Sequence, residues 1–170
     1  MKLLKIFFFI IINIILNFSF ANAEQNLKFA NIDEILQKTY IGKKTLNKIN
    51  EIDQSNIKKL NNFEKELKKK EKEIELKKNI ISEEEFNKQV ADLKNKIINF
   101  NKKKNLMVNE FSEMKKKELK NLFDRINPII QNYMSENSIE ILLNTKNVFI
   151  GSKKSDLTDI LINEINIKIK

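Results

Sequence analysis

Apolar residues recur at alternating spacings of three and four along the middle of this chain, in two separate runs. Such heptad spacing places the apolar side chains on one side of a helix, where a second helix can cover them. The first run has core-type positions at Leu46, Ile49, Asp53, Asn56, Leu60, Phe63, Leu67, Lys70, Ile74, Lys77 and Ile81. The second run has them at Phe86, Val90, Leu93, Ile97, Phe100, Lys104, Met107, Phe111, Met114 and Glu118. Most of these positions are apolar, so the sequence predicts two long helices that pack against each other.

The segment between the two runs carries a helix-start signal and predicts a reversal of the chain. Ser82 can cap a helix, and Glu85 stands three residues later, where a capping box places its carboxylate. The acidic residues 83–85 favour the positive end of a helix dipole, and Ile81 and Phe86 occupy the staple positions. We therefore expect the chain to fold back with its tip near residues 79–82.

A reversal centred near residues 80 and 81 matches the two apolar seams without a shift of register. The hairpin arm then covers residues 43–126, and its first helix is roughly 55 Å long at 1.5 Å per residue. Polar residues at some core-type positions, Lys70 and Lys77 among them, predict a loosely zipped and mobile tip. The expected antiparallel pairs are Leu67 with Leu93, Phe63 with Ile97, Leu60 with Phe100, and Ile49 with Phe111.

Few turn-forming residues and a high proportion of charge agree with long helices. The chain has two glycines, one proline and 32% charged residues, which leaves little material for tight loops or a large sheet. The sequence lacks histidine and cysteine, so the commonest general base, disulfides and thiolate metal sites are excluded. It also lacks a nucleophile elbow and a phosphate-binding glycine loop. We therefore expect no enzyme activity, no catalytic residues, no cofactor and no metal.

The first 23 residues have the layout of a secretory signal peptide. Two lysines precede an apolar run from Ile6 to Leu16, and Ala21-Asn22-Ala23 forms a small-x-small cleavage site. The alternative is an uncleaved membrane anchor, but two asparagines interrupt the run and no basic stop-transfer cluster follows it closely. We expect export of the chain and cleavage of this segment.

The chain is basic, with a net charge of +9 at pH 7, and removal of residues 1–23 leaves +7. An acidic or anionic partner is therefore expected. All basic residues except Arg125 are lysines, whereas nucleic-acid recognition usually draws on arginine forks. For an exported, lysine-rich chain we expect no nucleic-acid partner.

The beginning of the mature chain carries the signals of a small body. Residues 27–32 alternate apolar and polar side chains as a half-buried strand does, and residues 33–39 indicate a short helical turn. Residues 40–42, which end with Gly42, are expected to form a bend before the arm. Beyond the arm, Asn127-Pro128 either interrupts the second long helix or starts its continuation to about Glu136.

Two strands and a closing helix are expected at the end of the chain. Asn137 can take the left-handed conformation that ends a helix. Residues 139–143 and 147–150 have the pattern of strands joined at residues 144–146, and Gly151 marks their exit. Ser155 or Asp156 is expected to cap a helix whose buried stripe includes Leu157, Ile160, Leu161 and Ile165. The predicted fold class is α+β and mainly α, with a body or trimerisation domain from residues 24–42 and 127–170.

This order of elements behind a signal peptide resembles the Skp/OmpH family of periplasmic chaperones over the whole mature chain. Residues 28–36 look like the family's opening strand and turn, and Gly42-Lys43-Lys44 stands where its first arm begins. Residues 135–144 are similar to the family's helix end and following strand, and residues 155–161 are similar to its closing helix start. Asn137-Ser138 stands where the family often has glycine with an aromatic residue. Because nearly all basic residues are lysines, a lipopolysaccharide-binding patch built on arginine forks is left unassigned.

The resemblance implies a homotrimer with a barrel-like body and three hairpin arms around a central cavity. In such a trimer the chain is an ATP-independent periplasmic holdase that binds unfolded outer-membrane proteins in the cavity. Short strands in so small a body are marginal alone, which also favours assembly. The residues expected in the trimer body are Leu27, Phe29, Ile32, Ile139, Ile141, Leu143, Val148 and Ile150.

Apolar residues beside or outside the two seams and a lysine run near the tip are the candidate client-binding positions. Dispersed apolar side chains offer many weak contacts, and lysines attract acidic clients or anionic membrane lipid. The apolar candidates are Ile52, Ile57, Leu76, Ile98, Leu106 and Val108, and the basic ones are Lys68, Lys69, Lys70, Lys72, Lys77, Lys78 and Lys88. A plainer interpretation also stands, because single exposed apolar residues are common and lysines on long helices serve solvation.

The alternative function is a non-catalytic structural spacer or adhesion stalk of the cell envelope, for which paired helices alone would be sufficient. Stalks usually extend a parallel coiled coil over many heptads. Here the seam is expected to reverse near Ser82 and both chain ends to close into one body, which favours the chaperone hypothesis.

Overall fold

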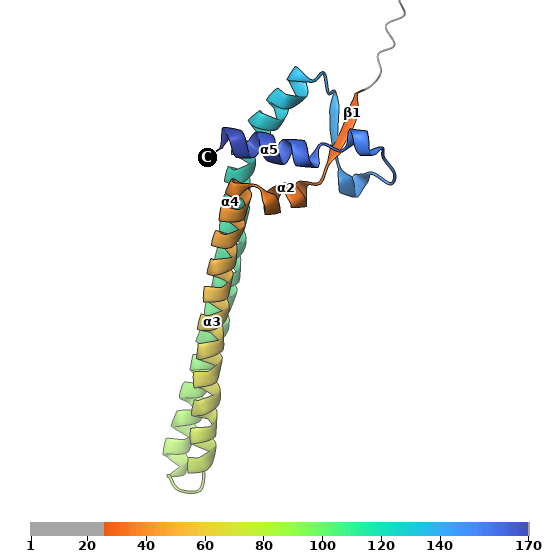
Figure 1. Ribbon diagram of the computed structural model, residues 1–170. Helices are drawn as coiled ribbons and strands as arrows, with labels where there is room; N and C mark the ends of the chain where they lie inside the picture. Colours follow the sequence, from red (N-terminus) through yellow and green to blue (C-terminus); the bar gives the residue numbers. More distant parts are fainter. Residues whose placement is uncertain (1–25, 170) are drawn as a thin grey trace, which may run out of the picture.

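The structure, a computed structural model, describes residues 26–169 as a long helical hairpin attached to a small α+β body (Figure 1). The predicted fold class is confirmed. The signal peptide expected over residues 1–23 lies outside the described residues. The elements are β1 (Leu27–Ala30), α2 (Ile32–Lys38), α3 (Tyr40–Lys77), α4 (Glu83–Glu136), β2 (Ile141–Asn144) and α5 (Thr158–Lys168), with 3₁₀ turns at Thr145–Asn147 and Lys153–Ser155.

The arm consists of α3 and the first part of α4, which lie antiparallel and side by side (Figure 1). The chain reverses at residues 78–82, where the sequence predicts it. Ser82 caps α4, because its hydroxyl accepts a hydrogen bond from the backbone N–H of Glu85 at 3.3 Å. The Glu85 carboxylate accepts a hydrogen bond from Gln89 at 2.8 Å, so it acts within the helix and not as the second half of a capping box.

Gly42 lies inside the first turn of α3, so the bend expected at residues 40–42 is wrong. The change of direction occurs one residue earlier, at the buried Thr39. The Thr39 hydroxyl accepts a hydrogen bond from the Gly42 N–H at 3.2 Å and donates one to the Ile35 carbonyl at 2.8 Å, which joins α2 to α3. A Cβ on Gly42 would lie 2.1 Å from the Leu36 carbonyl oxygen, so glycine serves close packing here.

α4 runs through Pro128 without a break and thereby connects the arm to the body. Of the two outcomes that Asn127-Pro128 left open, the structure shows continuation. Proline has no N–H for the Asp124 carbonyl one turn earlier, which weakens the helix locally. Figure 1 shows α4 changing direction where it enters the body.

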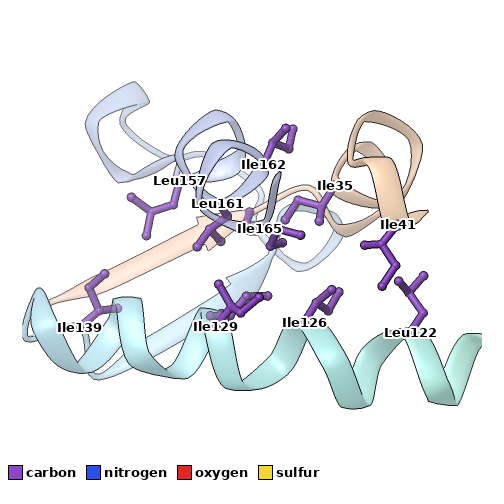
Figure 2. Packing of buried hydrophobic residues seen from close by; sticks show 12 residues of the cluster. Ile35, Ile41, Leu122, Ile126, Ile129, Ile139, Leu157, Leu161, Ile162 and Ile165 are labelled. Carbon is purple, nitrogen blue, oxygen red and sulfur yellow. The ribbon is translucent and has the colours of Figure 1, made fainter. Parts of the chain in front are cut away.

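The core of the body lies between the end of α4, α2 and α5. Ile35, Leu161 and Ile165 are completely buried, and Leu122 and Ile126 nearly so. Figure 2 shows that the α4 side chains of this cluster point toward those of α5. Full burial of one such side chain contributes about 1.5–3 kcal/mol, so this cluster fixes both ends of the chain to the root of the arm.

α5 buries a broader face than the predicted stripe. Ile160 is 43% exposed, whereas Ile162 is buried together with Leu161 and Ile165, so the expectation for Ile160 is wrong. The reason is that α5 packs against two elements, α2 and α4, instead of one. The N-cap of α5 is Leu157, which makes no side-chain cap, so neither Ser155 nor Asp156 holds the expected cap position. The Asp156 carboxylate, one residue before the N-cap, accepts a hydrogen bond from the Thr158 N–H at 2.9 Å.

α4 ends in a Schellman motif centred one residue later than predicted. Asn137 has φ −108°, and the left-handed residue is Ser138 with φ 53°. The Ile139 N–H donates to the Met134 carbonyl at 2.9 Å, and the Ser138 N–H donates to the Ser135 carbonyl at 3.3 Å. The Asn137 side chain instead donates to the Tyr133 carbonyl at 2.8 Å.

The sheet of the described chain has two parallel strands, β1 and β2, with Leu27 opposite Ile141 and Phe29 opposite Leu143. The second C-terminal strand expected at residues 147–150 is therefore wrong for the single chain. Asn144 starts a 3₁₀ turn, because its side chain accepts a hydrogen bond from the Lys146 N–H at 3.1 Å. On its other edge β1 forms a single bridge between Phe29 and Asp156, where the Leu157 N–H donates to the Phe29 carbonyl at 2.9 Å.

Replacement of Gly42 by alanine is expected to lower the free energy of unfolding by about 1–3 kcal/mol, as overpacking does at a rigid backbone contact. The added methyl group would meet the Leu36 carbonyl oxygen, which cannot move without opening the junction of α2 and α3. Chemical denaturation followed by circular dichroism measures the effect. Asn50→Ala, on an exposed position of α3, is the matched control and should lose no stability. An unchanged midpoint for Gly42→Ala would contradict the close approach.

Candidate functional site

The seam of the arm follows the heptad positions of both helices. Ile49 and Ile74 are buried, and most other core-type positions are half-buried. The polar residues Asp53, Asn56 and Lys70 are half-buried as well, so they lie in the seam and not on its outer surface. The arm is therefore held by a single apolar stripe on each helix, with polar gaps.

The outer surface of the arm carries most of the apolar residues expected to contact a client. Leu76 is 76% exposed, Leu106 is 60% exposed, and Ile57, Ile98 and Val108 are also exposed. Ile52 is half-buried beside the seam. These six side chains come from both helices and offer separate contacts along the arm.

The antiparallel pairing of α3 and α4 places some of these residues at the same height along the arm. Phe63 faces Phe100 with 6.4 Å between the ring centroids, and Lys48 pairs with Glu118 at 2.6 Å nearer the body. Phe63 thus contacts Phe100, which lies about one helical turn along α4 from the expected partner Ile97. This register brings residue 57 to about the same level as residues 106 and 108, whereas residue 52 lies nearer the body and Leu76 lies near the tip.

The lysine run lies on the outer arm and is mostly solvated. Lys68, Lys69, Lys72, Lys77, Lys78 and Lys88 are exposed, and Lys70 is half-buried. Within residues 68–78 of the described chain, the ion pair that forms joins Lys70 to Glu73 at 3.6 Å. Six lysines stand against three glutamates within residues 68–78, so this part of the arm keeps a net positive charge.

Two depressions flank the seam in the middle of the arm, and sequence reasoning missed them. Leu67 and Phe100 line both. The larger has a volume of about 370 Å³ and is lined by Phe63, Glu66, Leu67, Lys70, Lys96, Asn99, Phe100 and Lys103. The smaller has a volume of about 230 Å³ and is lined by Glu64, Leu67, Lys68, Glu71, Leu93, Ile97, Phe100 and Asn101. The spacing i, i+3, i+4, i+7 on both helices was the signal that could have indicated the larger one.

The residues expected in the trimer body divide into two groups. Phe29 and Ile139 are buried within the chain, and Ile32, Leu143 and Val148 are half-buried. Leu27, Ile141 and Ile150 are exposed, and so is the neighbouring Phe149, which the sequence reasoning did not single out. An exposed apolar group of this size on a small body is typical of an interaction surface.

Two further findings concern the described residues 26–169. Their acidic side chains form no cluster of three that could hold a metal ion. None of their helices combines the length and the apolar character needed to cross a bilayer.

A small α+β body that carries one long antiparallel hairpin defines a class of coiled-coil-armed proteins. A model of the OmpH-like outer membrane protein family matches residues 27–165, and the chain belongs to that family. Among solved structures it is similar to an OmpH-like protein from Caulobacter crescentus, described as a candidate outer membrane chaperone. The TM-score is 0.74 at 21% identity, over 88% of this chain and 89% of that one, which establishes a shared fold. A search of the curated proteins finds no match.

Replacement of the half-buried Asn56 by leucine is expected to tighten the seam. A leucine there buries apolar surface against α4 and should stabilise this part of the arm by about 1 kcal/mol, because its burial is partial. Hydrogen exchange of the backbone amides in residues 49–63 measures the gain. Ser55→Leu adds the same side chain on the exposed side of α3 and should leave exchange unchanged. Equal protection in both variants would show that residue 56 lies outside the seam.

Proposed function

We propose that this chain is an ATP-independent holdase chaperone of the periplasm, which binds unfolded outer-membrane proteins in a cavity between the arms of a homotrimer. The observation that carries the proposal is the exposed surface of the arm. The seam residues of α3 and α4 cover one another, yet apolar side chains such as Leu76 and Leu106 remain exposed among lysines. Membership of the OmpH-like family and the likeness to a candidate outer membrane chaperone support the same role.

The arm is suited to hold a client by many weak contacts. A leucine-sized side chain contributes about 1.5–3 kcal/mol when fully buried, and less when an unfolded chain covers only part of it. Several such contacts within one cavity act together, because the first raises the effective concentration for the next. The client is thus retained without a nucleotide cycle and released when its own folding competes.

The charge of the arm selects clients of opposite sign. The chain without residues 1–23 carries +7, and the outer arm has solvated lysines such as Lys68 and Lys72. Acidic clients are attracted over about one Debye length, roughly 8 Å at physiological salt. Anionic membrane lipid is attracted by the same field. Export to the periplasm follows from the signal peptide expected at residues 1–23.

The body is suited to assembly through its exposed apolar residues. Phe149 and Ile150 are almost completely exposed, and Leu27 and Ile141 on the two strands are exposed as well. In the described chain β2 pairs with β1 alone, which leaves its other edge open. Val148 has extended backbone geometry, with φ −110° and ψ 113°. Residues 148–150 of one copy can therefore add to the open edge of another, where the strand expected from the sequence would form.

The purified chain without residues 1–23 is expected to prevent aggregation of a urea-denatured outer-membrane β-barrel protein after dilution, in the absence of ATP. Light scattering measures aggregation, and size-exclusion chromatography with light scattering gives the mass of the free chaperone. Suppression at about one trimer per client supports the proposal. An envelope spacer would leave aggregation unchanged, and that result would refute a holdase role.

Variants of the arm relate the activity to the exposed apolar residues. In Leu76→Ser combined with Leu106→Ser, we expect the concentration for half-maximal suppression to rise about three- to tenfold, because two partial apolar contacts are lost. Ile167→Ser, on an exposed residue of α5, removes an apolar group away from the arm and should have no effect. Equal activity of the parent chain, the double variant and Ile167→Ser would exclude Leu76 and Leu106 as contact points.

Replacement of Phe149 and Ile150 by aspartate is expected to shift the mass in solution from three chains to one. Burial of two carboxylates in an apolar interface costs several kcal/mol per charge, which exceeds what most small interfaces tolerate. The mass is measured by light scattering, and circular dichroism confirms that the helices persist. Ile167→Asp, which places a charge on another exposed apolar position, should remain trimeric. A trimer in the double variant would place the interface elsewhere.

A further inference from the structure

The larger depression of the arm is a built feature of the two helices. Each helix contributes four residues at the spacing i, i+3, i+4, i+7, so the lining forms one stripe from α3 and one from α4. The stripes begin at Phe63 and Lys96 and end at Lys70 and Lys103. Seven residues of helix rise correspond to roughly 10 Å, which gives the length of the depression along the arm. Its volume of about 370 Å³ lies at the lower end of the range for ligand sites.

The floor of the depression is aromatic. The rings of Phe63 and Phe100 are tilted by 48° to each other with their centroids 6.4 Å apart, within the distance range of favourable aromatic pairs. Leu67 completes the apolar lining. The Lys103 ammonium lies 4.2 Å from the centroid of the Phe63 ring. A cation is thereby held directly over the apolar floor.

The rim of this depression is basic. Lys70, Lys96 and Lys103 stand against a single acid, Glu66. Lys70 is partly engaged with Glu73 at 3.6 Å, whereas none of the ion pairs within residues 26–169 involves Lys96 or Lys103. Two ammonium groups of the rim can therefore accept a new anionic partner.

The smaller depression on the other side of the same seam has the opposite charge. Its charged lining residues are Glu64 and Glu71 against Lys68. The two depressions share Leu67 and Phe100, so they offer similar apolar contacts and differ chiefly in sign. An anionic apolar ligand is thus favoured on one side of the arm and disfavoured on the other.

We propose that the larger depression binds one aromatic side chain of a client together with carboxylates that flank it in the client sequence. This inference rests on the proposed function and names the segment that each arm recognises. An aromatic ring fits a half-open depression roughly 10 Å long and packs on Phe63 and Phe100, while the carboxylates reach Lys96 and Lys103. A lipid acyl chain would extend beyond such a short floor.

A photoreactive peptide tests the site on the whole chain without residues 1–23. The probe carries benzoylphenylalanine between two glutamates, and peptide mapping by mass spectrometry locates the crosslinks. We expect them within residues 63–70 and 96–103. Two control peptides should bind more weakly than this probe. One has glutamines in place of the glutamates, and the other has alanine as the central residue and is measured by fluorescence anisotropy. Crosslinks confined to the tip or spread evenly over the arm would overturn the proposal.

Two sets of variants separate charge from shape. Lys96→Glu with Lys103→Glu should weaken peptide binding roughly tenfold, whereas Lys94→Glu with Lys102→Glu, on exposed positions outside the depression, should change it less than twofold. Asn99→Trp leaves the charges unchanged, fills the depression from an exposed position and should also abolish binding. Equal weakening by both charge-reversal pairs would overturn the site, since only net charge would then matter.

Aggregation assays on the same proteins keep this inference separate from the proposed function. If the parent chain suppresses aggregation but does not bind the peptide, the depression is not the recognition site and the holdase role stands. If the parent chain binds the peptide at the depression but does not suppress aggregation, the holdase role fails and the site remains. Binding of phosphatidylglycerol vesicles that depends on Lys96 and Lys103, without peptide binding, would assign the depression to lipid and overturn the proposal.

Discussion

The apolar seam between α3 and α4 is the interaction on which the rest of the structure depends. Long helices as rich in lysine and glutamate as these have little packing of their own, and each becomes stable by covering the other's apolar stripe. The seam is one stripe wide, so most side chains of the arm stay exposed. That geometry gives a small chain a large surface, with apolar and basic groups distributed along it.

The body keeps the arm in place through two contacts with different physical origins. On α4, the helix continues past Pro128 and presents Ile126 and Ile129 to the core, so the arm and the core share one continuous helix. On α3, Thr39 and Gly42 bring the first turn into close contact with the end of α2. An arm held at both roots hangs from the body in a defined direction, as the arrangement of a cavity would require.

Much of this architecture could be predicted because it depends on local signals. Heptad spacing predicted the seam, and Ser82 with the acids after it predicted the reversal. The errors fall where two distant segments decide the outcome. Ile162 is buried in place of Ile160 because α5 meets both α2 and α4. Residues 147–150 form no strand because the chain leaves β2 through the 3₁₀ turn that Asn144 caps. Ser138, and not Asn137, adopts the left-handed conformation because the Schellman hydrogen bonds fit one residue later.

By itself, the sequence determined the helical hairpin, the place of its tip, the basic charge and the absence of the residues that most catalytic and metal sites need. These properties follow from residue types and from spacings within one helix. Only the tertiary structure decided which side of the arm is basic and which is acidic around the shared Leu67 and Phe100. It also decided that Phe149 and Ile150 stay exposed. Such features arise from the register between two helices and from the packing of distant segments, which no single stretch of the sequence encodes.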